Sequence, residues 1–401
     1  MGRSVRERTD ACPGALTTHH AADGPLARIR VPGGAISAPQ LAALAGGADE
    51  CASGKLHLTS RANVQIRAVR DVDDLAARLS GAGLLPAPPH ERVRNILASP
   101  MSGIRGGLTD VRHLVTELDA AICNEPRLTE LPGRFQFGLD DGRGDLPPGS
   151  LDVGWRAVDD TSGALVVGGA ASGLHAERNV AVPAMISAAL AFLDLRAEDG
   201  SGAWRVRELD PTSLHRLPPM IMNTYRPMGS ISVHDHRRGG GAESVGVYRH
   251  STGDAVAIVA GVAFGTLTSA QLRLLAQLAP ERAVVTPWRS VIVPGLDPDA
   301  AADVTARLDE AGFLLNPGDS ALRVSACIGS PGCASSAADV RTDARAVLAE
   351  LPAGPPIHIS GCERRCGRPQ AEHVDVVATS EGYVVNGGAP TGLSSIVPGR
   401  D

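Results

Sequence analysis

The chain has 401 residues, of which 43% are hydrophobic and 20% are charged, and its formal net charge is -6. A chain longer than about 250–300 residues is expected to form more than one folding unit. The negative charge argues against nucleic acid as the main partner, because such binding needs a basic surface.

The sequence also predicts that the protein is not bound to a membrane. The most apolar run, residues 181–195, contains Pro183 and is shorter than the roughly 20 residues that span a bilayer. The N-terminus has no hydrophobic signal region. We therefore expect a cytoplasmic protein, in which the seven cysteines are reduced thiols, metal ligands or nucleophiles.

The predicted elements follow the order strand, helix, strand, helix, and this order occurs twice. Each copy starts with an apolar strand and a glycine-rich turn, followed by a Ser or Thr cap and a helix with a Gln-Leu pair. A second strand and a second helix complete each copy. The corresponding segments are 26–44 and 256–275, then 57–67 and 284–293, then 75–85 and 304–315.

A weaker similarity joins the segments that follow the two copies. Residues 151–169 and 374–388 both contain an Asp-Val strand start and end in a Gly-Gly pair. Three matches in the same order predict two tandem halves, about 1–200 and 203–401. Residues 209–228 are predicted to connect the halves, and residues 236–242 to form an exposed turn.

Four late cysteines form the strongest chemical motif. Cys327 and Cys333 are spaced C-x5-C, and Cys362 and Cys366 follow 28 residues later as C-x3-C. The first pair encloses small residues and the second is flanked by Gly361 and Gly367, and small residues allow backbone amides to approach and donate to sulfur. Four thiolates suit a cubane iron–sulfur cluster, whereas structural zinc sites use tighter spacings. The spacing favours a cluster and leaves zinc and unrelated core thiols as alternatives.

The other cysteines carry weaker signals. Cys51 and Cys123 have no partner nearby in the sequence and are interpreted as ordinary thiols. Cys12 lies in a turn-like segment that is followed by His19, His20 and Asp23. A mononuclear metal site there is the alternative to a structured N-terminal turn.

One predicted strand has a polar face. Arg61, Asn63, Gln65 and Arg67 alternate along it and therefore share one side. Such a row is either solvated surface or the wall of an anion-binding cavity, since Arg forks bind carboxylates in bidentate fashion. The corresponding strand of the second half carries valines and only Arg289 in this role.

The cysteine quartet, the repeat and the Thr-Ser-Arg strand motif at 59–61 together resemble the nitrite/sulfite reductase superfamily. The resemblance implies an α+β, pseudo-twofold duplicated fold with two ferredoxin-like half-domains and two cofactor-binding α/β domains. The implied domains are the first half-domain at 1–88, the first α/β domain at 89–202, the connector with the second half-domain at 203–318, and the iron–sulfur domain at 319–401.

Within the superfamily, the N-terminal Cys12-Pro13-Gly14 and Ala22-Asp23-Gly24 elements, and Arg94-Asn95, are most similar to the precorrin-3B synthase branch. The resemblance implies a 4Fe-4S cluster on Cys327, Cys333, Cys362 and Cys366. Two arginines of the superfamily's anion site match Arg61 and Arg94. Its two lysines match Arg134 and Gln136, so one charge is missing and sulfite reduction is in doubt.

The expected activity is oxygen-dependent monooxygenation of a tetrapyrrole, precorrin-3A, with a reduced donor that is NADH-linked or of the ferredoxin type. The candidate substrate-binding residues are Arg61, Arg67, Arg94, Arg134, Asn63, Gln65 and Gln136. A non-haem iron is also expected, with His19, His20 and Asp23 as guessed ligands, and sirohaem is less favoured. The alternatives are a sirohaem-dependent nitrite or sulfite reductase, and a non-catalytic iron–sulfur electron-transfer or zinc protein.

Overall fold

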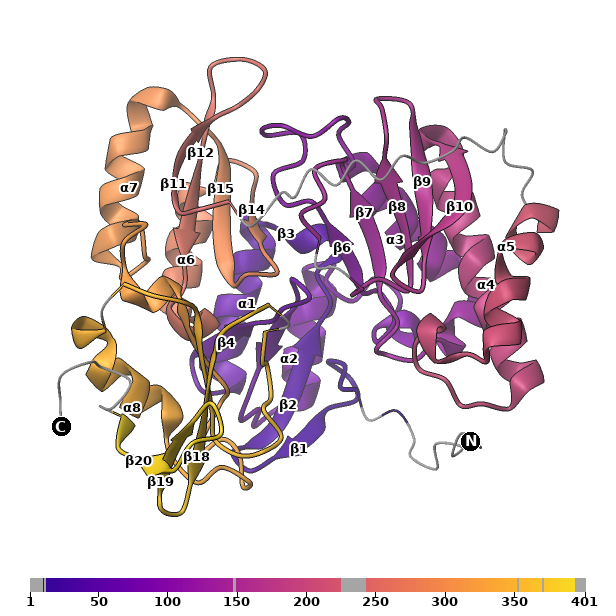
Figure 1. Cartoon of the computed structure of the whole chain (residues 1–401). Coiled ribbons are helices and arrows are strands. Elements are labelled where there is room, and N and C mark those ends of the chain that lie inside the picture. Colours follow the sequence, from indigo (N-terminus) through magenta and orange to yellow (C-terminus); the bar gives the residue numbers. More distant parts are fainter. Residues whose placement is uncertain are drawn as a thin grey trace.

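The computed structural model describes residues 10, 12–146, 149–224, 243–351, 353–369 and 371–393. Four five-stranded sheets and their helices form the described part of the chain, with the first half-domain near the centre (Figure 1). The α-helices of these residues are α1 (Ala38–Cys51), α2 (Val72–Gly81), α3 (Arg112–Asn124), α4 (Ala181–Asp199), α5 (Pro211–Thr224), α6 (Ser269–Leu278), α7 (Ala301–Glu310) and α8 (Val340–Val347).

The first two sheets are built alike and exchange one strand. The first contains, in spatial order, β1 (His19–Ala21), β2 (Gly24–Ile29), β5 (Val64–Ile66), β4 (Lys55–Leu58) and β13 (Thr266–Thr268). The second contains β11 (Gly246–Arg249), β12 (Val256–Gly261), β15 (Ser290–Leu296), β14 (Arg282–Val285) and β3 (Ala35–Ser37). Each half of the chain thus supplies the last strand of the other half's sheet. One hydrophobic core includes Leu41 and Leu44 of α1 together with Leu272 and Leu275 of α6.

The exchanged strands lead into matched helix starts. Ser37 caps α1 and Thr268 caps α6, and in both cases the Gln three residues later completes a capping box. The sequence predicts these caps, and the structure confirms them. The turn before β3 requires a glycine, because Gly34 has a φ of +75° and a Cβ there would lie 2.1 Å from the carbonyl oxygen of Val285.

The third and fourth sheets also share one topology, with three parallel strands followed by two antiparallel ones. The third contains β6 (Ile96–Ala98), β7 (Phe137–Asp140), β8 (Val153–Ala157), β9 (Ser162–Val167) and β10 (Ala170–Glu177). The fourth contains β16 (Val324–Ala326), β17 (Ile357–Ser360), β18 (Val374–Thr379), β19 (Gly382–Val385) and β20 (Pro390–Thr391). The predicted α+β, duplicated fold is therefore confirmed.

Helix α4 is long and apolar enough to cross a membrane by length and composition. In the structure it is a core helix, because ten of its residues, including Met185, Phe192 and Leu195, are buried in the core that they share with the third sheet. Helix α5 packs against α4 and occupies most of the segment that was predicted to be a connector. The predicted turn at 236–242 lies outside the described residues.

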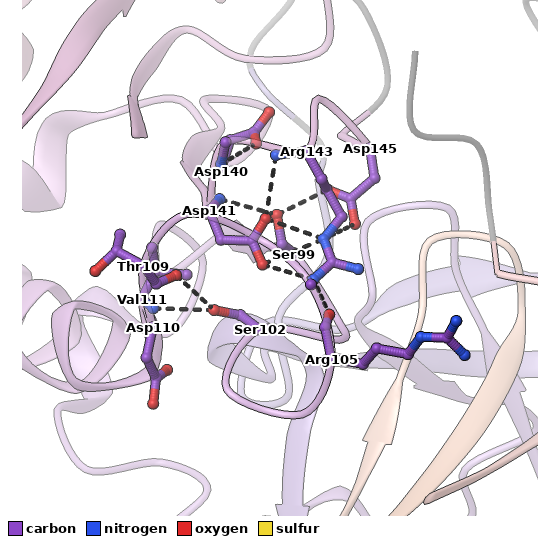
Figure 2. Close-up of polar contacts among 12 residues, drawn as sticks. Ser99, Ser102, Arg105, Thr109, Asp110, Val111, Asp140, Asp141, Arg143 and Asp145 are labelled. Atoms are coloured by element: carbon purple, nitrogen blue, oxygen red, sulfur yellow. Dashed lines mark hydrogen bonds and ion pairs between the residues drawn. The ribbon is translucent and has the colours of Figure 1, made fainter. Parts of the chain in front are cut away.

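A buried network fixes the loops at the end of β7 (Figure 2). The Ser99 hydroxyl donates to Asp145 at 2.7 Å and accepts from the backbone N–H of Asp141 at 3.1 Å. Arg143 pairs with Asp141 at 2.8 Å and lies 3.6 Å from Asp145. Burial, opposed by the hydrogen bond from Ser99, raises the pKa of Asp145 to about 7. Asp145 is therefore protonated in the folded protein at a pH where it is ionised in the unfolded chain.

Replacing Asp145 by Asn should make stability less dependent on pH. Since the folded pKa lies above the unfolded value, the wild type loses stability as pH rises toward about 7. Between pH 5 and 8 this loss is about 2–3 kcal/mol, and the Asn variant lacks it. Denaturant unfolding at both pH values measures the difference. Asp160→Asn, at an exposed site, is the control, and parallel curves for wild type and Asp145→Asn would contradict the assignment.

Candidate active site

A row of polar side chains crosses the first sheet in register. Arg28 of β2 is paired with Gln65 of β5, Gln65 with His57 of β4, and His57 with Thr266 of β13. Directly paired residues point to the same side of a sheet. The alternate residues of the same strands, including Leu56 and Ile66, are buried in the core on the other side. We call Arg28, Gln65, His57 and Thr266 the polar row.

The polar row continues into a cluster of arginines around Cys12. The Cys12 sulfur accepts from Arg28 Nη1 at 3.1 Å and from Arg30 Nη2 at 3.6 Å, and it donates to the carbonyl of Gly133 at 3.2 Å. Arg30 is 1% exposed. Arg30 Nη1 and Nη2 also donate to the carbonyls of Pro13 and Arg92, while its buried Nε has no hydrogen-bond partner among the described residues.

Arg30 and the nearby Arg61 are desolvated without a bonded counter-charge. Among the described residues, no carboxylate forms an ion pair with Arg28, Arg30 or Arg61. Burial lowers the pKa of Arg30 to about 10, and the neighbouring Arg28 and Arg61 add to this effect. Burial and the nearby Arg205 lower the pKa of Arg61 to about 10. Buried charges are costly unless paired, so this cluster is suited to bind an anionic ligand.

The structure divides the predicted substrate-binding residues into two groups. Arg61 and Gln65 lie at this cationic wall, and the Gln65 amide, oriented with its oxygen toward Arg28, accepts from both Nε and Nη2. Arg134 is exposed and its guanidinium lies 5.0 Å from the ring centroid of Trp204. Asn63 is buried, where it accepts from the N–H of Val31 and donates to Asn95.

Arg67, Arg94 and Gln136 are engaged in structural contacts. Arg67 forms a bidentate pair with Asp23 and also donates to the carbonyl of Gly332 at 2.6 Å. Arg94 forms a bidentate pair with Asp119, at 2.7 Å for both bonds, and donates to Leu84. The Gln136 amide is 1% exposed and donates to the carbonyls of Asn95 and Phe137. The geometry gives no support for direct substrate binding by these three side chains.

The two cysteine pairs follow neighbouring parallel strands. Cys327 comes directly after β16, and Cys362 comes two residues after β17, so both lie at the carboxyl edge of the fourth sheet. The backbone N–H of Gly361 donates to the Cys327 sulfur at 3.1 Å. Burial raises the pKa of Cys366, and the nearby thiols of Cys327, Cys362 and Cys333 raise it further. All four sulfurs therefore face a common region.

The donor set fits a cubane cluster better than a single ion. All seven cysteines are free thiols. Within the described ranges, no three His, Cys, Asp or Glu side chains are placed to hold one metal ion. Four thiolates around one zinc would be only about 3.8 Å apart, given Zn–S bonds of about 2.3 Å, whereas those of a cubane bind four different irons and lie further apart. The Gly361 donor is typical of the amide–sulfur contacts around such clusters.

The structure gives no support for the guessed ligands of a mononuclear iron. Asp23 is bound to Arg67, and His19 and His20, as neighbours on β1, point to opposite faces of the sheet. Cys12, the other candidate for a mononuclear site, has arginines and a carbonyl as neighbours. The described residues thus offer no ligand set for this iron.

Sequence reasoning missed several residues of this wall. Arg28 and Arg30 alternate on β2 and its end, so the period-2 rule that identified Gln65 could have found them. His57 and Arg341 carried no such signal, because their association depends on contacts between distant segments. Arg341 donates to the Cys327 carbonyl at 2.9 Å and to Thr266 at 2.7 Å, and it links the cluster loop to the polar row.

Comparisons with known proteins agree with this architecture. Residues 20–82 and 248–311 match the nitrite/sulfite reductase ferredoxin-like half domain. The chain is 27% identical to a precorrin-3B synthase from Sinorhizobium sp, over 98% of this chain and 86% of the relative. It is 24% identical to a ferredoxin–nitrite reductase from Synechococcus elongatus, over 90% of this chain and 78% of the relative. The structure of the Mycobacterium tuberculosis NirA protein covers 90% of this chain, and this chain covers 73% of NirA, with a TM-score of 0.71 and 19% identity. The relatives are oxidoreductases, and so is this protein.

Cys362→Ser should remove or degrade the cluster, because a thiolate ligand is lost. Iron and labile-sulfide analysis and the visible absorption of the purified variant measure this loss. Cys51→Ser is the matched control, since Cys51 is buried against Asp74, away from the quartet. Equal cluster content in the two variants would refute the ligand assignment.

Proposed function

We propose that this member of the nitrite/sulfite reductase superfamily is a monooxygenase that converts precorrin-3A to precorrin-3B in aerobic cobalamin biosynthesis. One atom of dioxygen enters the macrocycle as a hydroxyl group, and an acetate side chain closes to a γ-lactone. The second oxygen atom leaves as water, with two electrons and two protons supplied by a reduced donor of the ferredoxin or NADH-linked type. The expected location is the cytoplasm.

The observation that carries this proposal is the group of unpaired arginines beside the polar row. Arg28, Arg30 and Arg61 lie close together, and no carboxylate of the described residues is bonded to them. A precorrin carries acetate and propionate groups around its ring, and several guanidinium groups can bind them at once. The arginines orient the acidic macrocycle. The first sheet, whose other face is buried in the core, keeps water from the side of the ring that lies against it.

The cysteine quartet would hold a 4Fe-4S cluster, which when bound would supply single electrons to the reaction. The chain's own residues place the cluster loops against the substrate wall. Arg341 holds the Cys327 carbonyl, and Arg67 holds the carbonyl of Gly332, the residue before Cys333.

A sirohaem-dependent nitrite or sulfite reductase is the second candidate, because relatives of both kinds match the chain. The position of Gln136 argues against it. The resemblance places an anion-binding lysine there, whereas the Gln136 amide is neutral and bonded to backbone carbonyls. The site therefore has one positive charge fewer with which to bind a small dianion than a reductase of this type requires.

Anaerobic purification followed by iron, sulfide and haem analysis separates the two candidates. The monooxygenase proposal predicts about four irons and four sulfides per chain, no stoichiometric haem, and oxygen-dependent turnover of precorrin-3A with a reduced donor. A strong Soret band together with nitrite or sulfite reduction would overturn it.

Arg61→Met should weaken tetrapyrrole binding, because it removes a charge-assisted contact from the wall. A bond of this kind contributes about 1.5–3 kcal/mol, so the dissociation constant should rise at least about tenfold. Fluorescence quenching of uroporphyrin I, a tetrapyrrole with eight carboxylates, measures the change. Arg273→Met, on the surface of α6, is the control, and equal affinities in both variants would remove Arg61 from the binding site.

A further inference from the structure

His57 lies in the middle of the polar row, and only one of its ring nitrogens, Nδ1, has hydrogen-bond partners among the described residues. Its Nδ1 atom is 3.2 Å from Arg341 Nη1 and 3.2 Å from the Thr266 hydroxyl. Arg341 Nη1 also donates to Thr266 at 2.7 Å. The three side chains come from β4, β13 and α8, so the first half, the second half and the cluster domain all contribute to this contact.

These contacts determine which ring nitrogen carries the proton. A guanidinium group has only donors. Because Arg341 points an N–H at Nδ1, Nδ1 must accept, and the Thr266 hydroxyl, which accepts from Arg341, can donate its own proton to the same atom. The imidazole proton is therefore on Nε2. In the described part of the chain, Nε2 has no hydrogen-bond partner.

The surroundings also keep the ring neutral. Burial lowers the pKa of His57 to about 3, and Arg341, Arg67 and Lys55 lower it further. These cations come from α8, from the residue after β5 and from β4 itself, while β13 contributes the uncharged Thr266. At physiological pH the Nε2–H group is thus a neutral donor that does not titrate.

The Nε2–H group of His57 lies between the arginine cluster and the loops that carry the cysteines. Gln65 and Arg28 follow it in the row toward the arginine cluster, and Arg341 connects it to the Cys327 carbonyl on the other side. A ligand bound along the row by its carboxylates would pass over His57 before it reaches the cluster loops.

We propose that the Nε2–H group of His57 binds an oxygen atom of the bound tetrapyrrole, and that Arg341 and Thr266 are positioning residues that fix its tautomer. The identity of the ligand rests on the proposed function, whereas the tautomer does not. The arginines already attract the ligand by charge, and a neutral donor adds a directional hydrogen bond that fixes the orientation of the ligand. Since it does not take up a proton, it orients the ligand and is no acid catalyst.

The tautomer can be tested on the cluster-loaded protein with ¹⁵N-histidine labelling and nuclear magnetic resonance, with His57→Gln used for assignment. We expect one Nε2–H resonance set for His57 that stays unchanged from pH 5 to 8. Arg341→Met and Thr266→Val should each give a mixture of tautomers. A wild-type Nδ1–H form, or a ring that titrates near pH 6.5, would overturn the proposal.

Binding of uroporphyrin I tests the role of the donor. His57→Leu should raise the dissociation constant about tenfold or more, as expected for a bond to a charged group. His57→Gln, which keeps an N–H donor, should recover part of the loss, and His113→Leu, on the exposed side of α3, should bind like wild type. Wild-type affinity in His57→Leu would overturn this proposal alone. Failure of the wild type to bind any uroporphyrin would overturn the proposed function as well.

Discussion

The exchange of β3 and β13 between the two half-domains is the constraint on which the rest of the structure depends. Each half lacks one edge strand of its own, and each completes the other's sheet. Because the strands cross over, α1 and α6 pack into one core and the halves are held in a fixed relation. The same exchange brings Thr266, a residue of the second half, into the polar row of the first. The candidate active site therefore exists only when both halves are folded together.

The duplication is symmetric in its backbone and asymmetric in its chemistry. In the first sheet the face away from the helices carries Arg28, Gln65 and His57, whereas in the second sheet the equivalent face carries Val259 and Ile292, which are buried in an apolar cluster with Met101 and Ile104. Conversely, only the second α/β unit carries the cysteine quartet. One copy thus supplies a cationic wall and the other supplies the cluster. Arg67 and Arg341 join the two by hydrogen bonds to backbone carbonyls beside the cluster ligands.

The sequence was sufficient for the repeat, the helix caps and the fold class, because these depend on local patterns and on motifs with fixed spacing. The site was predicted only in part. Alternation placed Arg61, Asn63, Gln65 and Arg67 on one side, but it could not reveal that Asp23 binds Arg67 or that Asn95 binds Asn63. Arg94 was selected by its match to a motif, and its bidentate partner Asp119 lies 25 residues away in the sequence. Pairing of this kind between separate elements leaves no periodic trace, and the same is true of the contact between His57 and Arg341.

Strand exchange also affects how the chain is made. During synthesis, β4 is complete after residue 58, but its partner β13 is not available until residue 268 has been added. Through that interval the first sheet has an open edge, and open edges with apolar neighbours promote association between chains. At elongation rates of about 5–20 residues per second, the interval lasts roughly 10–40 s. The nascent first half is therefore the stage at which this protein depends most on chaperones and on a moderate rate of expression.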